Sequence, residues 1–231
     1  MKILAVSDIH QLKFNHHGVE RSENIYTLFK IINIERPDVV FICGDLENVT
    51  KQDMDDLKEL SIVLNFKVFI IFGNHDSPSI IEHSGMLVDG LVKYNNLTIG
   101  GIGGVVAKGI HDGVLRLNYD EFLIKSNKIK NDLIKDGKNL DILLTHELPK
   151  THNEVNNDFY DVRSSSVFGD ILYQLEPKLA ISGHLHGDGT FIFDYEYGTL
   201  INLGAFNEGH YVIINLDDNS YEIESIKPID I

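Results

Sequence analysis

The first third of the chain alternates short apolar segments with segments of helical periodicity. Apolar runs at residues 3–6, 38–42 and 67–72 have the length and β-branched content of buried strands. Between them, apolar residues recur at helical spacing over residues 25–32 and 54–64. This order requires parallel strands joined by helical crossovers. The sequence therefore predicts a βαβαβ opening and an α/β fold.

Both predicted crossover helices carry start and stop signals. Ser22 or Asn24 could cap the first helix, and Pro37 ends it. Thr50, with Asp53 three residues later, predicts a start resembling a capping box for the second helix. These signals bound both helices in sequence between the predicted strands.

The rest of the chain continues the mixture of strands and helices. Expected strands cover residues 91–94, 97–102, 141–145, 179–182, 190–194, 199–203, 211–216 and 221–226. One expected helix covers residues 119–134, and another is capped within residues 164–166 and ended by Pro177. The glycines at residues 100–104 lack the spacing of a dinucleotide fingerprint, so they predict close backbone approach. Because no composition shift marks a boundary, we expect residues 1–231 to form a single domain.

Charge and composition exclude several classes of protein. The net charge of −15 argues against an extended nucleic-acid surface, although bound cations could still attract an anionic substrate. Cys43 is the only cysteine, so no intramolecular disulfide can form. No apolar run is long enough for a signal peptide or a membrane span, and we expect a cytoplasmic protein without membrane contact.

Polar side chains follow five of the predicted strands directly. They are Asp8 and His10, Asp45, the run Asn74-His75-Asp76, His146, and the pair His184 and His186. Each cluster alone has an ordinary explanation, such as a turn, a helix cap or a surface imidazole. Together they are hard to explain by packing, because ligands of parallel sheets bind beyond the carboxyl ends of the strands.

The residue types in these clusters indicate metal chemistry. Imidazole, carboxylate and amide groups without a thiolate suit Mn, Fe, Ni or Zn rather than a cysteine-rich structural zinc site. Seven potential ligands are too many for one transition metal. They suit two ions about 3.5–4 Å apart that share one carboxylate.

In chain order the clusters read D-x-H, G-D, G-N-H-D, H and G-H-x-H, and in this order the sequence resembles the calcineurin-like metallophosphoesterases. The resemblance runs from Asp8 to His186. It implies a four-layer αββα sandwich, in which two mixed sheets pack face to face with helices outside.

The resemblance also assigns roles to the clustered residues. One metal would be held by Asp8, His10, Asp45 and His186, and the other by Asp45, Asn74, His146 and His184, with Asp45 as the bridge. His75 would be the proton donor rather than a ligand. Asp76 would orient His75 or raise its pKa, and a helix N-cap is its alternative role.

The expected reaction is hydrolysis of a small phosphorylated substrate, with a phosphodiester favoured. Two divalent ions would lower the pKa of a bridging water, with Mn favoured and Fe, Ni and Zn as alternatives. The segment Leu46-Glu47-Asn48-Val49-Thr50 replaces the V-D-R-G of Ser/Thr protein phosphatases, which argues against that activity. A phosphomonoesterase, a nucleotide pyrophosphohydrolase, and a non-catalytic scaffold like the retromer subunit of this fold remain alternatives.

The sequence offers a few basic and imidazole side chains outside the metal clusters as substrate contacts. Arg163, in the polar segment 147–165, is the candidate for gripping a phosphate; Lys150, Arg116 and Lys108 are similar but weaker candidates. His16 and His17 could line the rim of the site. Edge strands of the C-terminal half could pair across a dimer.

Overall fold

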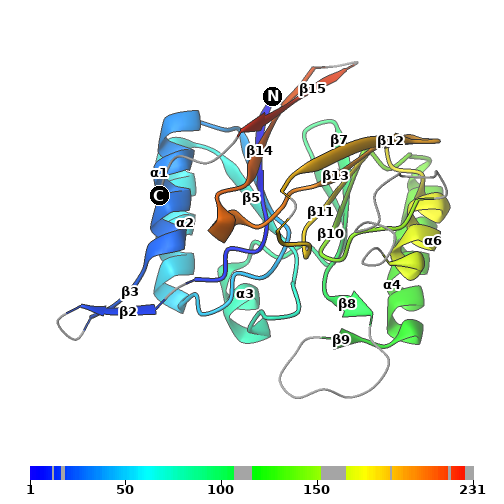
Figure 1. The fold of residues 1–231 in the computed structure, drawn as a ribbon. Helices are drawn as coiled ribbons and strands as arrows, with labels where there is room; N and C mark the ends of the chain where they lie inside the picture. The colour runs from blue at the N-terminus through cyan, green and yellow to red at the C-terminus, as the bar shows by residue number, and fades with distance from the viewer. Residues whose placement is uncertain are drawn as a thin grey trace.

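The computed structural model describes residues 1–11, 13–16, 19–106, 116–151, 165–187, 189–217 and 220–226. Two sheets lie side by side in the middle of the molecule (Figure 1). Helices α1 and α2 cover the outer face of one sheet, and α4 and α6 cover the outer face of the other (Figure 1). The predicted αββα arrangement of two mixed sheets flanked by helices is confirmed.

The first sheet contains the predicted βαβαβ unit. Its strand order is β15-β14-β1-β4-β5. The strands are β1 (Lys2–Val6), β4 (Val39–Ile42), β5 (Lys67–Ile70), β14 (Tyr211–Leu216) and β15 (Tyr221–Ile226). The crossovers are α1 (Glu23–Glu35) and α2 (Lys51–Leu64). Because Val6 pairs with Ile42 and Ile42 with Ile70, the three parallel strands end at the same level.

The second sheet has the order β12-β13-β11-β10-β7-β6. Its strands are β6 (Gly90–Tyr94), β7 (Leu97–Ile102), β10 (Ile142–Thr145), β11 (Leu179–Ser182), β12 (Phe191–Tyr195) and β13 (Gly198–Asn202). The four inner strands are parallel, and the two edge strands are antiparallel to their neighbours. Helices α4 (Tyr119–Asp136) and α6 (Ser166–Leu175) cover this sheet.

Three apolar layers hold the sandwich together. Alternate residues of β1 point to opposite faces, so Leu4 packs in the layer beneath α1 and α2 while Ile3 packs between the sheets. Phe122 of α4 and Phe168 of α6 meet in the third layer, where their ring centroids are 4.2 Å apart. The sheet faces are thus buried on both sides, as their nearly continuous apolar strands require.

Local signals predicted several details correctly. Thr50 and Asp53 form the capping box at the start of α2. A β-carbon on Gly103 would lie 2.5 Å from the backbone nitrogen of Phe72, so the expected close backbone approach is present. The oxygen of Phe72 also accepts a hydrogen bond from the amide of Gly104, after β7 of the other sheet. The predicted strand 67–72 is shorter in the structure, where β5 stops at Ile70.

Some short elements were not predicted. A hairpin of β2 (Lys13–His16) and β3 (Val19–Ser22) replaces part of the expected loop. The others are the strand pair β8 (Val105–Val106) and β9 (Arg116–Leu117), and the 3₁₀ turn η1 (Phe206–Glu208). The short helix implied by the alternative N-cap role of Asp76 is present as α3 (Pro78–Ser84). Within the described residues, no helix combines the length and apolar character needed to cross a membrane.

Candidate metal centre

Asp8, His10 and His186 form a first donor group at the carboxyl end of β1. His186 Nε2 lies 3.0 Å from Asp8 Oδ1 and 3.2 Å from His10 Nε2. One donor atom of each residue lies within 4.8 Å of the other two. Two imidazole nitrogens that face each other at this distance, beside a carboxylate, fit a shared divalent cation.

Asp45, His146 and His184 form a second donor group. His146 is fully buried, and its Nε2 lies 3.4 Å from Asp45 Oδ2 and 3.0 Å from Asn74 Oδ1. The His146 and His184 rings are neighbours, with centroids 5.0 Å apart. The strand-end clusters that lie far apart in the sequence therefore meet at one place.

Asp45 lies between the two donor groups. Its Oδ2 is 3.7 Å from His10 Nε2 in the first group and 3.4 Å from His146 Nε2 in the second. Its Oδ1 accepts a hydrogen bond of 2.8 Å from the backbone amide of His75. One carboxylate oxygen thus faces both groups while the other fixes the side chain. This is the geometry expected of a ligand that two cations share.

Hydrogen bonds on the far side of two imidazoles orient them toward the centre. His146 Nδ1 donates to the backbone oxygen of Cys43 at 2.7 Å. His10 Nδ1 lies 2.7 Å from Glu47 Oε2. In the neutral imidazole these acceptors hold the proton on Nδ1, so that Nε2 is the nitrogen that can bind a cation. Glu47 was missed as a site residue from the sequence; its only signal was its position two residues after Asp45.

The backbone at the centre adopts an unusual conformation. Asp8, His10, Asp45 and His184 have φ of 55°, 39°, 53° and 68°, in the left-handed region that residues with a β-carbon rarely occupy. Such strain costs of order 1–3 kcal/mol per residue and clusters at functional sites. It turns each side chain sharply out of its strand end and toward the neighbouring strand ends.

Glycines before the ligands allow the strand ends to approach. A β-carbon on Gly73 would lie 2.1 Å from Asp45 Oδ1, and one on Gly183 would lie 1.8 Å from Ser7 Oγ. Neither position can accept a side chain without a shift of its neighbours. This explains why glycine precedes Asn74 and His184 in the sequence.

Each donor group contains a carboxylate whose pKa is low and an imidazole whose pKa is high. Burial lowers the pKa of His10, but hydrogen bonds to Asp8 and Glu47 outweigh it and raise the pKa to about 9. Burial also lowers the pKa of His146, and the Asp45 charge raises it to about 9. Burial raises the pKa of Asp8 and Asp45, yet the neighbouring histidines hold both below the usual range.

His184 differs from these two imidazoles. Burial and the nearby His146 charge lower its pKa to about 4, so it is neutral at physiological pH. A cation can therefore bind His184 without displacing a proton, whereas His10 and His146 must each lose one.

We expect the affinity for Mn²⁺ to rise with pH. Because His10 and His146 are protonated below about pH 9 without metal, each proton lost should contribute about a tenfold gain in affinity per pH unit between pH 7 and 8. Above about pH 9 the affinity should level off. Isothermal titration calorimetry in two buffers of different ionisation enthalpy measures both the affinity and the protons released. Equal affinity at pH 7 and pH 8 would contradict this account.

The role predicted for Asp76 is wrong. Its carboxylate accepts hydrogen bonds from the backbone amides of Asp45 at 3.0 Å, Leu46 at 2.7 Å and Gly73 at 2.6 Å. No hydrogen bond joins it to His75 among the described residues, and Ser77 is the N-cap of α3. Asp76 instead ties the loop after β4 to the loop after β5. It is a positioning residue for Asp45.

Removing the Asp76 carboxylate should lower the stability of the folded protein. Asp76→Ala leaves three buried amides without an acceptor, which should lower the free energy of unfolding by about 3–5 kcal/mol. Urea unfolding followed by circular dichroism measures this. Asp170→Ala, at an exposed position of α6, is the matched control. Equal stability of the two variants would show that the three hydrogen bonds contribute little.

His75 lies beside the donor groups without belonging to either. Its ring centroid is 5.6 Å from that of His10, and the residue is exposed to solvent. It can therefore meet a bound molecule, which fits the predicted role of proton donor. Arg163, Lys108 and His17 lie outside the described residues, as do the side chains of His16 and Arg116.

Two sheets with helices outside and a double His/Asp donor site at the strand ends define a metallophosphoesterase. Residues 1–188 match the sequence model of the calcineurin-like phosphoesterase family. The chain belongs to this family, whose members use divalent metals. Membership of this family supports the assignment of the chain as a phosphoester hydrolase.

Individual proteins are similar to the chain in sequence or in fold. The chain is 27% identical over 202 residues to a probable cyclic nucleotide phosphodiesterase of Coxiella burnetii, a match that covers 84% of this chain and 79% of that protein. A solved structure from Thermus thermophilus superposes with a TM-score of 0.69 at 16% identity and covers 97% of this chain and 98% of its own. A dimetal phosphatase from Danio rerio gives a TM-score of 0.64 at 12% identity, covering 99% and 96%. The two structures share the fold.

Proposed function

We propose that the chain hydrolyses phosphodiesters of nucleotides or other small molecules at a two-metal centre. The observation that carries the proposal is the position of Asp45 Oδ2, which faces His10 Nε2 at 3.7 Å and His146 Nε2 at 3.4 Å. One carboxylate oxygen that faces two imidazole-containing donor groups is suited to two cations rather than one.

The first cation would be held by Asp8, His10 and His186, the second by Asn74, His146 and His184, and both by Asp45. When bound, such cations lower the pKa of water and offset the charge that grows on a phosphoryl group. Mn²⁺ is the favoured metal because imidazole and oxygen donors suit it, with Fe, Ni and Zn as alternatives.

His75 would act at the bond that breaks. As an oxygen from water forms a new bond to phosphorus, the P–O bond to the leaving alcohol opens and its electron pair moves to the alcohol oxygen, to which the His75 imidazole gives a proton. The hydrogen bond from the His75 amide to Asp45 Oδ1 at 2.8 Å holds its backbone against the metal centre. The Asp76 carboxylate accepts hydrogen bonds from the amides of Asp45 and Gly73 and so holds the same two loops together.

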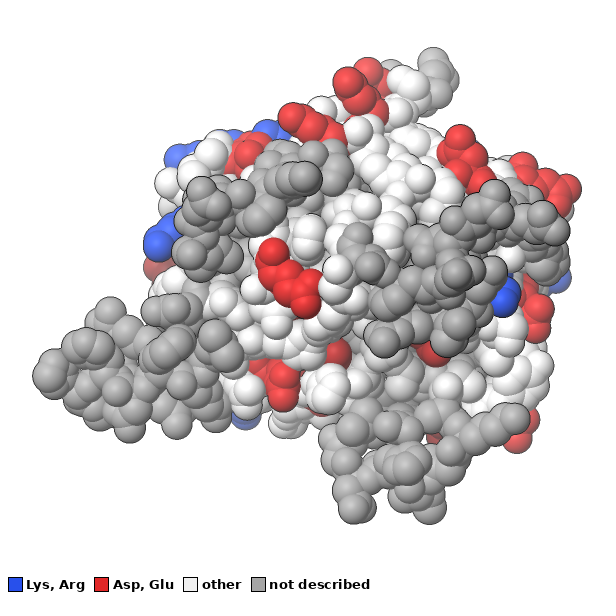
Figure 2. All heavy atoms as spheres, viewed as in Figure 1, with Lys and Arg blue, Asp and Glu red and all other residues white. Residues whose placement is uncertain are grey.

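The charge of the protein surface favours a small diester substrate over an extended polyanion. Among the described residues of the face shown in Figure 2, acidic side chains are spread over the surface, whereas basic ones lie nearer its edges. An extended polyanion would be repelled by such a surface, but a small substrate held by cations would not. The name of the Coxiella burnetii relative, a probable cyclic nucleotide phosphodiesterase, also supports a diester. We also propose that the protein is cytoplasmic. A dimer formed through its edge strands is a further proposal.

A screen of phosphorylated substrates tests the proposed reaction. Protein loaded with Mn²⁺ should hydrolyse bis-p-nitrophenyl phosphate with a higher kcat/KM than p-nitrophenyl phosphate or a dinucleoside pyrophosphate. Preference for the monoester or the pyrophosphate would favour those alternatives. Hydrolysis of none of the three, with any of Mn, Fe, Ni and Zn, would favour a scaffold.

A further inference from the structure

A pocket opens beside the metal centre, and of its lining residues only His75 and Asp76 belong to the predicted site. Its volume is about 800 Å³, within the range of small-molecule sites. Two segments form it: residues 47–51, which run from the loop after β4 into the first residue of α2, and residues 75–80, which run from the loop after β5 into the first turn of α3. These segments carry Glu47 and His75, so the pocket is continuous with the centre.

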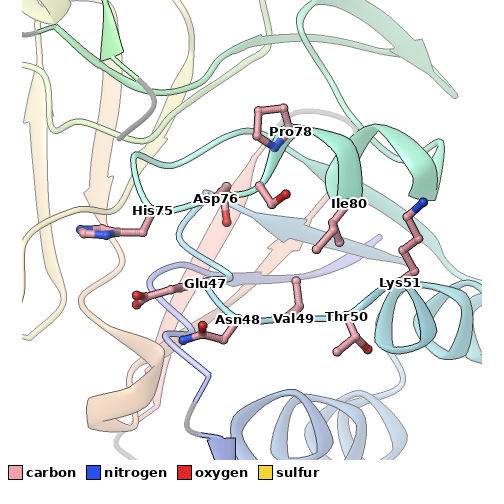
Figure 3. Close-up of a pocket in the computed structure, with 10 residues that line it drawn as sticks. Glu47, Asn48, Val49, Thr50, Lys51, His75, Asp76, Pro78 and Ile80 are labelled. Carbon is pink, nitrogen blue, oxygen red and sulfur yellow. The ribbon is translucent and has the colours of Figure 1, made fainter. Parts of the chain in front are cut away.

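The two ends of the pocket differ in chemistry. His75 and Glu47 lie together at one end, and Lys51 and Ile80 lie at the other (Figure 3). Since His75 would protonate the leaving oxygen, a leaving group attached to that oxygen has this pocket directly beside it. The pocket is therefore suited to the departing part of the substrate rather than to the phosphate.

The wall of the pocket is mixed in character. Val49, Pro78 and Ile80 provide apolar surface, and Asn48 and Ser77 provide an amide and a hydroxyl group. Apolar surface with a few polar groups is typical of sites for organic molecules that carry both rings and hydroxyls. A nucleoside has this combination, whereas a simple alcohol would leave most of about 800 Å³ unfilled.

Lys51 is unusual for its position in the chain. It is the first residue of α2, where the helix dipole disfavours a cation. Its side chain is exposed, and it forms no salt bridge with any acidic residue that the structure describes. Helix stability does not explain a lysine there, and a local rule broken beside a functional site points to a ligand.

We infer that this pocket binds the leaving group of the substrate, and that Lys51 selects a leaving group with a second negative charge remote from the scissile phosphate. The inference rests on the proposed function and narrows it to diesters that release a phosphorylated nucleoside. A charge at the far end would face Lys51, while the acidic Glu47 at the near end disfavours a charge there.

Paired dinucleotides isolate the effect of the remote charge. ApA, pApA and ApAp share one scissile diester and differ only in a terminal phosphate, and product analysis shows which nucleoside departs. Wild type should have a KM about 3- to 10-fold lower when the departing nucleoside carries that phosphate. Lys51→Ala should abolish this preference, so that the phosphorylated and unphosphorylated leaving groups give the same KM.

Two further variants complete the test. Lys58→Ala removes the same charge from an exposed position of α2 outside the pocket and should keep the preference. Ser77→Trp adds bulk to the pocket without loss of a capping bond, because the Ser77 side chain makes none. It should raise the KM of every dinucleotide about tenfold or more.

Several results would overturn the inference. One is that wild type shows no preference for a departing nucleoside with a terminal phosphate. Another is that Lys51→Ala and Lys58→Ala lose this preference equally. The third is that Ser77→Trp has the same dinucleotide kinetics as wild type. Hydrolysis of bis-p-nitrophenyl phosphate by wild type separates the two proposals. If wild type cleaves it and any of these results is found, only the pocket assignment fails; if wild type does not cleave it with any metal, the proposed function fails.

Discussion

Asp45→Asn should remove most of the bound metal and most of the activity. The substitution keeps the shape of the side chain, and its amide oxygen can still accept the hydrogen bond from the His75 amide. It removes the negative charge from the oxygen that faces both donor groups. Since cations supply several kcal/mol of transition-state stabilisation, kcat/KM should fall by about 10³-fold or more.

Metal analysis of the same variant gives a second readout. After equilibration with Mn²⁺ and gel filtration, Asp45→Asn should retain fewer than one ion per chain. Asp170→Asn, which removes the same charge from the exposed face of α6, should match wild type in metal content and rate. If Asp45→Asn lost one ion and kept the other tightly bound, Asp45 would belong to a single donor group.

His75→Asn should separate chemistry from metal binding. His75 belongs to neither donor group, so metal content should be unchanged. The loss of a proton donor should lower kcat by about 10²–10⁴-fold for substrates with an alkoxide leaving group. p-Nitrophenolate needs little protonation, so its release from bis-p-nitrophenyl phosphate should slow much less.

The comparison of leaving groups distinguishes a proton donor from a residue that only shapes the site. A purely structural role would slow alkyl and nitrophenyl esters by the same factor. His83→Asn is the matched control, because His83 is exposed on α3 and contacts Asp55 rather than the centre. If His75→Asn lost metal, His75 would be a ligand and its assigned role would be wrong.

The fold and the meeting of the clusters could be predicted because their signals are local. Strand and helix periodicity, the capping box at Thr50 and the parallel connection rule are all read from neighbouring residues. Parallel strands that end in register then bring Asp8, Asp45 and Asn74 to one edge. No distant contact had to be known for this step.

The errors concern contacts that only tertiary structure creates. Asp76 follows His75 in sequence, but its carboxylate reaches the amides of Asp45 and Leu46, about thirty residues earlier in the chain. Glu47 likewise contacts His10, which lies 37 residues earlier in the chain. Sequence adjacency favoured the wrong partner for Asp76 and gave no partner for Glu47. The pocket that ends at Lys51 likewise depends on how two loops lie side by side.

The central claim is that one shared carboxylate joins two metal sites. The most direct measurement is the number of ions bound per chain, obtained by plasma mass spectrometry after equilibration of the wild-type protein with Mn²⁺ and removal of free metal. The structure predicts about two ions per chain. One ion per chain, or none, at saturating metal would contradict the account.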